Sequence, residues 1–151
     1  MWRKGVAKRN HLVLMTIFYA INNLYTALGS PSVPGWIPNA GDPCADGWQG
    51  VQCVGPNITA IILNDADLGG ELGENLGIFT SIIMIDLSNN RISGSIPENL
   101  PITLRELNIQ NNQLSGTLDV LQYLPLNYLN VENNLFSGFV PTKLASIPNF
   151  R

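Results

Sequence analysis

The sequence predicts an α/β repeat solenoid, a coil of short units stacked side by side. Three observations predict it. A pattern of apolar residues and glycine occurs four times between residues 61 and 141, with steps of 24, 22 and 22 residues. Each copy begins with two apolar residues one position apart, which is the alternation of a short strand. A pair of cysteines stands directly before the first copy, where a solenoid needs a cap.

The four copies share the spacing L-x-L-x-x-N-x-L-x-G-x-L, which at this period is typical of leucine-rich repeats. We assign four repeats to residues 57–143. Each unit is too small to bury its own apolar side, so neighbouring units must share one core. We expect the paired apolar residues to point inward from parallel strands that form an inner wall. These pairs are Ile61 and Leu63, Ile85 and Leu87, Leu107 and Ile109, and Leu129 and Val131.

An asparagine follows the strand in three of the four repeats, at Asn90, Asn112 and Asn134. A buried asparagine can form hydrogen bonds with backbone groups that a turn leaves unpaired. We therefore expect a ladder of three asparagines along the stack. Ala66 occupies the same position in the first repeat, so the ladder should begin at the second repeat.

The second half of each repeat has the spacing Leu-x-Gly-x-Ile, twice followed by proline. This spacing resembles the plant-type leucine-rich repeat, in which the segment forms a second short strand. The match recurs four times in register. The copies begin at Leu68, Ile92, Leu114 and Phe136.

The only two cysteines, Cys44 and Cys53, lie just before the first repeat. Two buried free thiols are one interpretation. A metal site would need further ligands, and the only histidine, His11, lies far upstream. A disulfide that closes a short loop is favoured in a secreted context. Trp48, inside this loop, is expected to cover the open end of the first repeat.

The segment Gly-Asp-Pro-Cys, followed by Trp-x-Gly-Val-x-Cys, resembles the N-terminal cap of plant leucine-rich-repeat receptor kinases. Residues 23–31, 100–104 and 147–151 resemble one branch of these receptors, the STRUBBELIG-receptor family. Such receptors have a short repeat ectodomain, one membrane span and an intracellular kinase-like domain. The resemblance implies that this chain is only the N-terminal portion of the ectodomain. We assign the cap to residues 22–56 and the start of a further, truncated repeat to residues 144–151.

Residues 1–21 are predicted to form a leader that resembles a secretory signal, because four basic residues precede an apolar run of about ten residues. A bilayer takes about 20 apolar residues, so this run is too short to span one, and an uncleaved membrane anchor is the less favoured alternative. Small residues allow cleavage before Ser30, whereas the family resemblance keeps residues 22–28 in a cap helix. Cleavage near Ala20, or a misjoined or degenerate start, would remove this conflict. We expect the secretory pathway, with the chain secreted or at the extracellular side of the plasma membrane.

Charge restricts the possible partners. After Gly29 the chain has four basic and eleven acidic residues, a net charge of −7. This acidity argues against nucleic acid and anionic membrane surfaces as partners. We expect a protein or peptide ligand or a co-receptor. Membrane contact would come only from a missing downstream segment or an uncleaved leader.

The repeats contain no histidine and no nucleotide-binding motif, so we expect no enzyme activity and no cofactor. Residues 65–71 faintly resemble a calcium loop, but Leu76 stands where the bidentate glutamate is required. We therefore expect no metal site. Asp86 and Glu106 could imitate a glycosidase pair, although solvated charges on the strand face are the favoured interpretation.

These inferences predict an extracellular leucine-rich-repeat ectodomain that binds a ligand or co-receptor. The alternatives are a secreted leucine-rich-repeat protein that inhibits a microbial enzyme and a scaffold with no signalling part. The sequon at Asn57 is a glycosylation candidate. The candidate binding face is the solvent side of the wall, with Met84 and Tyr128 as apolar anchors, and ordinary solvated strand residues are the alternative. The candidate face consists of Met84, Asp86, Ser88, Glu106, Asn108, Gln110, Tyr128, Asn130 and Glu132.

The last repeat is expected to leave part of its apolar side uncovered, because the chain ends soon after it. Exposed apolar patches and an open sheet edge promote association. We therefore expect self-association of this segment. The side chains expected to be partly uncovered are Leu129, Val131, Phe136 and Val140.

Overall fold

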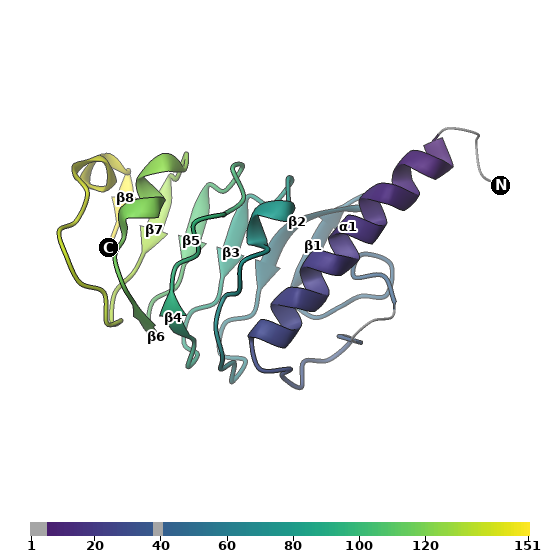
Figure 1. Ribbon diagram of the computed structural model, residues 1–151, viewed down its shortest axis with the longest axis horizontal. Helices are drawn as coiled ribbons and strands as arrows, with labels where there is room; N and C mark the ends of the chain where they lie inside the picture. The colour runs from purple at the N-terminus through teal and green to yellow at the C-terminus, as the bar shows by residue number, and fades with distance from the viewer. Residues whose placement is uncertain (1–5, 38–40) are drawn as a thin grey trace.

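A computed structural model describes residues 6–37 and 41–151, with side chains described from residue 15 onward. One long helix, α1 (Val6–Ala27), lies against the first turns of a coil, and the coil continues from there to the C-terminus (Figure 1). Residues 1–5 of the expected leader lie outside the described residues.

The main sheet has six strands in the order β1-β2-β3-β5-β7-β8. β1 (Val51–Val54) pairs antiparallel with β2, and all later pairs are parallel. Equivalent residues of successive repeats face each other, since Ile61 pairs with Ile85 and Leu107 pairs with Leu129. The predicted solenoid and its parallel inner wall are confirmed. We call its five parallel strands the strand wall: β2 (Asn57–Ile62), β3 (Met84–Asp86), β5 (Glu106–Asn108), β7 (Tyr128–Asn130) and β8 (Asn149–Phe150).

A second, smaller sheet pairs β4 (Ser93–Ser95) with β6 (Gln113–Ser115) in parallel. The expected second strand therefore forms in the middle repeats. In the first and last repeats, single backbone hydrogen bonds continue this pairing. One runs from the Ser137 N–H to the Gly116 carbonyl at 2.8 Å. The glycine of the motif is required at Gly70, where φ is 68° and a Cβ would collide with the Ala27 carbonyl oxygen.

Short 3-10 turns close the coils on the side opposite the strand wall. They are η1 (Leu76–Ile78), η2 (Asp119–Tyr123) and η3 (Thr142–Ser146). The second repeat differs, because residues 97–104 form no 3-10 helix, only a bend at Glu98 and a turn at Ile102 and Thr103. The helical side is therefore uneven along the stack.

One continuous core extends from α1 to η3, as stacking of small units requires. The inward apolar pairs of the four repeats are buried, apart from the partly buried Val131. The prediction that Leu129 is partly uncovered is wrong, because β8 pairs with β7 and Phe150 packs against the core. Val131 and Phe136 are partly buried and Val140 is exposed, as expected.

Helix α1 continues without interruption across residue 21, where the sequence analysis places the end of the leader. Ala20 and Ile21 are fully buried, in the same core as Leu24 and Leu28. Cleavage after Ile21 would therefore remove apolar contacts from the cap. In the described part of the chain, no helix is both long enough and apolar enough to cross a bilayer.

Candidate functional site

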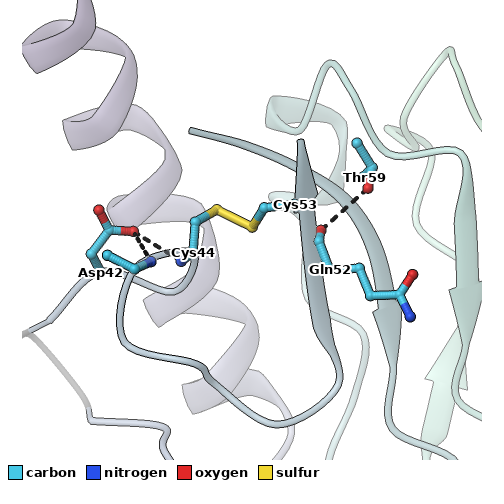
Figure 2. Close-up of a disulfide and its surroundings, with 6 residues drawn as sticks. Asp42, Cys44, Gln52, Cys53 and Thr59 are labelled. Atoms are coloured by element: carbon cyan, nitrogen blue, oxygen red, sulfur yellow. Dashed lines mark hydrogen bonds between the residues drawn. A yellow bond between two sulfur atoms is a disulfide. The ribbon is translucent and has the colours of Figure 1, made fainter. Parts of the chain in front are cut away.

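A disulfide joins Cys44 to Cys53, with a Cα–Cα distance of 5.7 Å, which confirms the predicted bond. Figure 2 shows that it fastens the loop before β1 to β1 itself. The Asp42 carboxylate accepts hydrogen bonds from the backbone N–H groups of Cys44 at 2.9 Å and Ala45 at 3.2 Å. This turn positions Cys44 for the bond.

A row of aromatic rings fills the cap beside the disulfide. Trp48 is buried, as predicted, and its ring centroid lies 5.1 Å from that of Trp36. Trp36 stacks in turn on Tyr25 of α1 at 6.2 Å, and its indole N–H donates to the Gln49 carbonyl at 2.8 Å. Trp36 was not identified from the sequence, because it lies outside any periodic pattern.

The predicted asparagine ladder is present and bonds to the backbone of two repeats at once. The Asn112 amide donates to the carbonyls of Leu87 at 2.9 Å and Ile109 at 3.2 Å, and its oxygen accepts from the Ile92 N–H at 3.0 Å. Asn90 accepts from the N–H of Ala66, so the ladder begins at the second repeat, as expected. We call Asn90, Asn112 and Asn134 the inner ladder.

A second ladder, which the sequence analysis missed, runs beside the first on the surface. The Asn111 amide donates to the Asn89 side-chain oxygen at 2.6 Å, and the Asn133 amide donates to that of Asn111 at 2.7 Å. All three have positive φ, between 54° and 57°, a conformation that asparagine tolerates. We call Asn89, Asn111 and Asn133 the outer ladder. Each of these repeats has two consecutive asparagines, and this pair was the sequence signal that could have predicted the outer ladder.

The strand wall brings the candidate binding residues into columns across neighbouring repeats. Met84 pairs with Glu106, and Glu106 with Tyr128, so these three form one column. Asp86, Asn108 and Asn130 form the next column in the same way. Ser88, Gln110 and Glu132 follow two positions beyond that column, after the strands end.

Three members of the expected binding face are not open to solvent, which corrects the sequence analysis. Ser88, Asn108 and Asn130 are only 4%, 7% and 6% exposed. Their short side chains form hydrogen bonds close to their own strand. The Ser88 hydroxyl donates to Asp86 at 2.6 Å, and the Asn130 side-chain oxygen accepts from the Glu132 N–H at 3.0 Å. These bonds keep the three side chains close to the wall.

The rest of the expected face reaches solvent at least in part. Met84 and Tyr128 are partly exposed and lie on either side of Glu106. Asp86 and Glu106 are partly exposed, and Glu132 is exposed. The wall thus combines three carboxylates with two large side chains that can serve as anchors. A partner can bind there through polar contacts to the carboxylates and apolar contacts to Met84 and Tyr128, on either side of Glu106.

Asn57 is exposed at the first residue of β2, near the turn from β1. Two residues later the Thr59 hydroxyl donates to the Gln52 carbonyl at 3.3 Å (Figure 2). The side chain of Asn57 is therefore accessible, and its glycosylation stays a prediction.

Asp67, an acidic residue of the first repeat, contacts the second repeat. Asp67 forms an ion pair with Arg91 at 2.7 Å, and both side chains are exposed. Within the described residues, no three His, Cys, Asp or Glu side chains are grouped to hold a metal ion. Because the ion pair links equivalent positions of two repeats, it belongs to the stack.

Comparison with known proteins supports the repeat assignment. The family model Leucine Rich Repeat matches residues 81–101 and 103–124. The chain is 58% identical over 86 residues to Protein STRUBBELIG-RECEPTOR FAMILY 3 of Arabidopsis thaliana. That alignment covers 57% of this chain and 11% of the relative, so the chain spans about a tenth of the relative's length.

Two solved structures share the fold. The crystal structure of PEPR1–AtPEP1 has a TM-score of 0.75 and 27% identity, over 89% of this chain and 20% of that one. The BIR3–SERK2 complex from Arabidopsis thaliana has a TM-score of 0.69 and 27% identity, over 87% of this chain and 76% of that one.

Proposed function

We propose that this chain is a member of the STRUBBELIG-receptor family of plant leucine-rich-repeat proteins and is the part of an extracellular domain that binds a ligand or co-receptor. The observation that carries this proposal is the strand wall, where Met84 and Tyr128 lie on either side of Glu106 in one column. A partly exposed aromatic residue, such as Tyr128, is a common anchor for a protein partner.

The wall is suited to binding because its side chains stand on a rigid support. Parallel pairing holds β3, β5 and β7 in register, and the inner ladder fixes the turn that follows each strand. Rigid positioning lowers the entropy cost of association. The BIR3–SERK2 structure, a complex of two proteins, supports a protein partner by its similarity.

We also propose where the chain is located and how it is modified. The chain would reach the extracellular side of the plasma membrane or the extracellular space, carry a glycan on Asn57 and have no enzyme activity of its own. The disulfide is consistent with an oxidising compartment. The similarity to a STRUBBELIG-receptor protein favours this proposal over inhibition of a microbial enzyme.

A binding screen with a matched pair of variants tests the proposal. The full 151-residue chain is measured against a panel of Arabidopsis leucine-rich-repeat ectodomains that includes BIR3 and SERK2. We expect one or more partners. The double variant Met84→Ala/Tyr128→Ala should bind such a partner more weakly by over ~1 kcal/mol if the two side chains are anchors.

The control is Met15→Ala/Tyr19→Ala, which removes the same two residue types from exposed positions on α1. It should bind like the unmodified chain. If the wall variant binds as tightly as the unmodified chain, the binding site is not on the strand wall. A complete lack of partners would contradict the proposed function.

A further inference from the structure

A groove lies on the helical side of the coil, between η1 and η2. Because residues 97–104 form no 3-10 turn there, the second repeat leaves a groove of about 740 Å³. The buried Leu100 contributes to its floor, and Ile78 of η1 and Tyr123 of η2 contribute to its sides. We call this space the helical-side groove.

Two large apolar side chains border this groove and yet are open to solvent. Ile102 and Tyr123 are each 78% exposed, although they come from different repeats. A single exposed apolar residue is ordinary on a protein surface. Two on one concave surface, beside a buried leucine, give an apolar site that a partner side chain could fill.

The groove also has a definite charge. Glu74 and Glu98 line it from the first and second repeats, and both are exposed. None of the described residues that line it is lysine or arginine. A partner that places cations against these two carboxylates would gain complementary charge, whereas an acidic partner would be repelled.

We propose that the helical-side groove docks a protein segment in which apolar side chains are flanked by lysine or arginine. This surface is separate from the strand wall, because the 3-10 turns and the wall lie on opposite sides of the coil (Figure 1). Docking in the groove does not depend on the binding of a partner at the strand wall. Both surfaces can be occupied at once, so the domain could connect two partners.

The first test uses three synthetic peptides and the amide NMR spectrum of the full chain. The basic apolar probe is Lys-Lys-Leu-Phe-Lys-Lys. The other two are Glu-Glu-Leu-Phe-Glu-Glu and Lys-Lys-Ser-Gln-Lys-Lys. We expect only the first to bind, with shifts at Ile78, Ile102 and Tyr123. Equal binding by the acidic or polar probe, shifts confined to the strand wall, or no shifts at all would overturn the proposal.

The second test removes the two charges while keeping side-chain volume. Glu74→Gln/Glu98→Gln should weaken binding of the basic probe about fivefold, because two exposed ion pairs are lost. Ile102→Ser should also weaken binding of the basic probe, because the apolar contact of the isoleucine side chain is lost. The control Asp65→Asn/Glu71→Gln removes the same net charge outside the groove and the strand wall, and should change affinity little.

The control also separates docking from general attraction. If Asp65→Asn/Glu71→Gln lowers affinity as much as the groove variant, the probe responds only to the overall charge and the proposal fails. The amide spectrum of each variant shows directly that the fold is kept. All four of these carboxylates and Ile102 are exposed, so folding should be unaffected.

Discussion

The cap and the repeat stack hold their backbones by different means. The cap uses features that occur once, namely the Cys44–Cys53 bond and the contact between Trp36 and Trp48. The stack uses one feature repeatedly, since each inner-ladder asparagine bonds to its own repeat and to the repeat before it. A change in the cap should therefore act locally, whereas a change in the ladder should weaken two repeats together.

The largest expected effect is in the inner ladder. Asn112→Ala would leave the Leu87 carbonyl and the Ile92 N–H without this side-chain partner in a buried site. Such losses cost about 1–3 kcal/mol per group, so we expect about 3 kcal/mol or more of lost stability. Urea unfolding measures this. A loss below 1 kcal/mol would mean that the ladder adds little to the stack.

The cap disulfide comes next. Cys44 and Cys53 are nine positions apart, and the chain-entropy model gives about 2–3 kcal/mol for such a loop. In Cys44→Ser/Cys53→Ser, hydrogen exchange should quicken in β1 and β2 and change little in β7. Mass measurement after alkylation gives the complementary check on the unmodified chain. Two alkylatable thiols without reductant would contradict the bond.

A smaller effect is expected in the outer ladder, where the same residue type is exposed. Asn111→Ala loses two side-chain bonds and places alanine at a φ of 57°, which costs about 1–2 kcal/mol. Asn111→Gly removes the same bonds but keeps the backbone conformation accessible. The glycine variant should be the more stable in urea. Equal losses would show that the bonds matter and the backbone conformation does not.

The smallest effect on stability is expected at the surface of the last repeat. Leu135 and Phe139 are exposed, Phe139 by 96%, whereas the third repeat has Gln113 and Thr117 at these positions. Leu135→Gln/Phe139→Thr should reduce self-association and change folding stability by less than about 0.5 kcal/mol. Light scattering at high protein concentration measures the association. A monodisperse, monomeric unmodified chain would contradict the expected self-association.

Part of the candidate site could be predicted from the sequence, and part could not. Strand alternation placed Met84, Glu106 and Tyr128 correctly in one column, because pairing in register follows from the repeat. The same alternation wrongly presented Ser88 and Asn108 as open to solvent. Alternation gives the face on which a side chain lies, but its exposure depends on side-chain length and on neighbouring groups.

The sequence by itself determined the coil, the inner ladder and the position of the cap. Each depends on residues whose spacing repeats or whose type is rare, so a linear pattern is sufficient to identify them. Tertiary structure alone decided that β8 buries Leu129 and that the ring of Trp36 packs against that of Trp48. It also decided that the second repeat leaves a groove bordered by Ile102 and Tyr123. These features arise where separate segments meet in space, and no local spacing specifies that meeting.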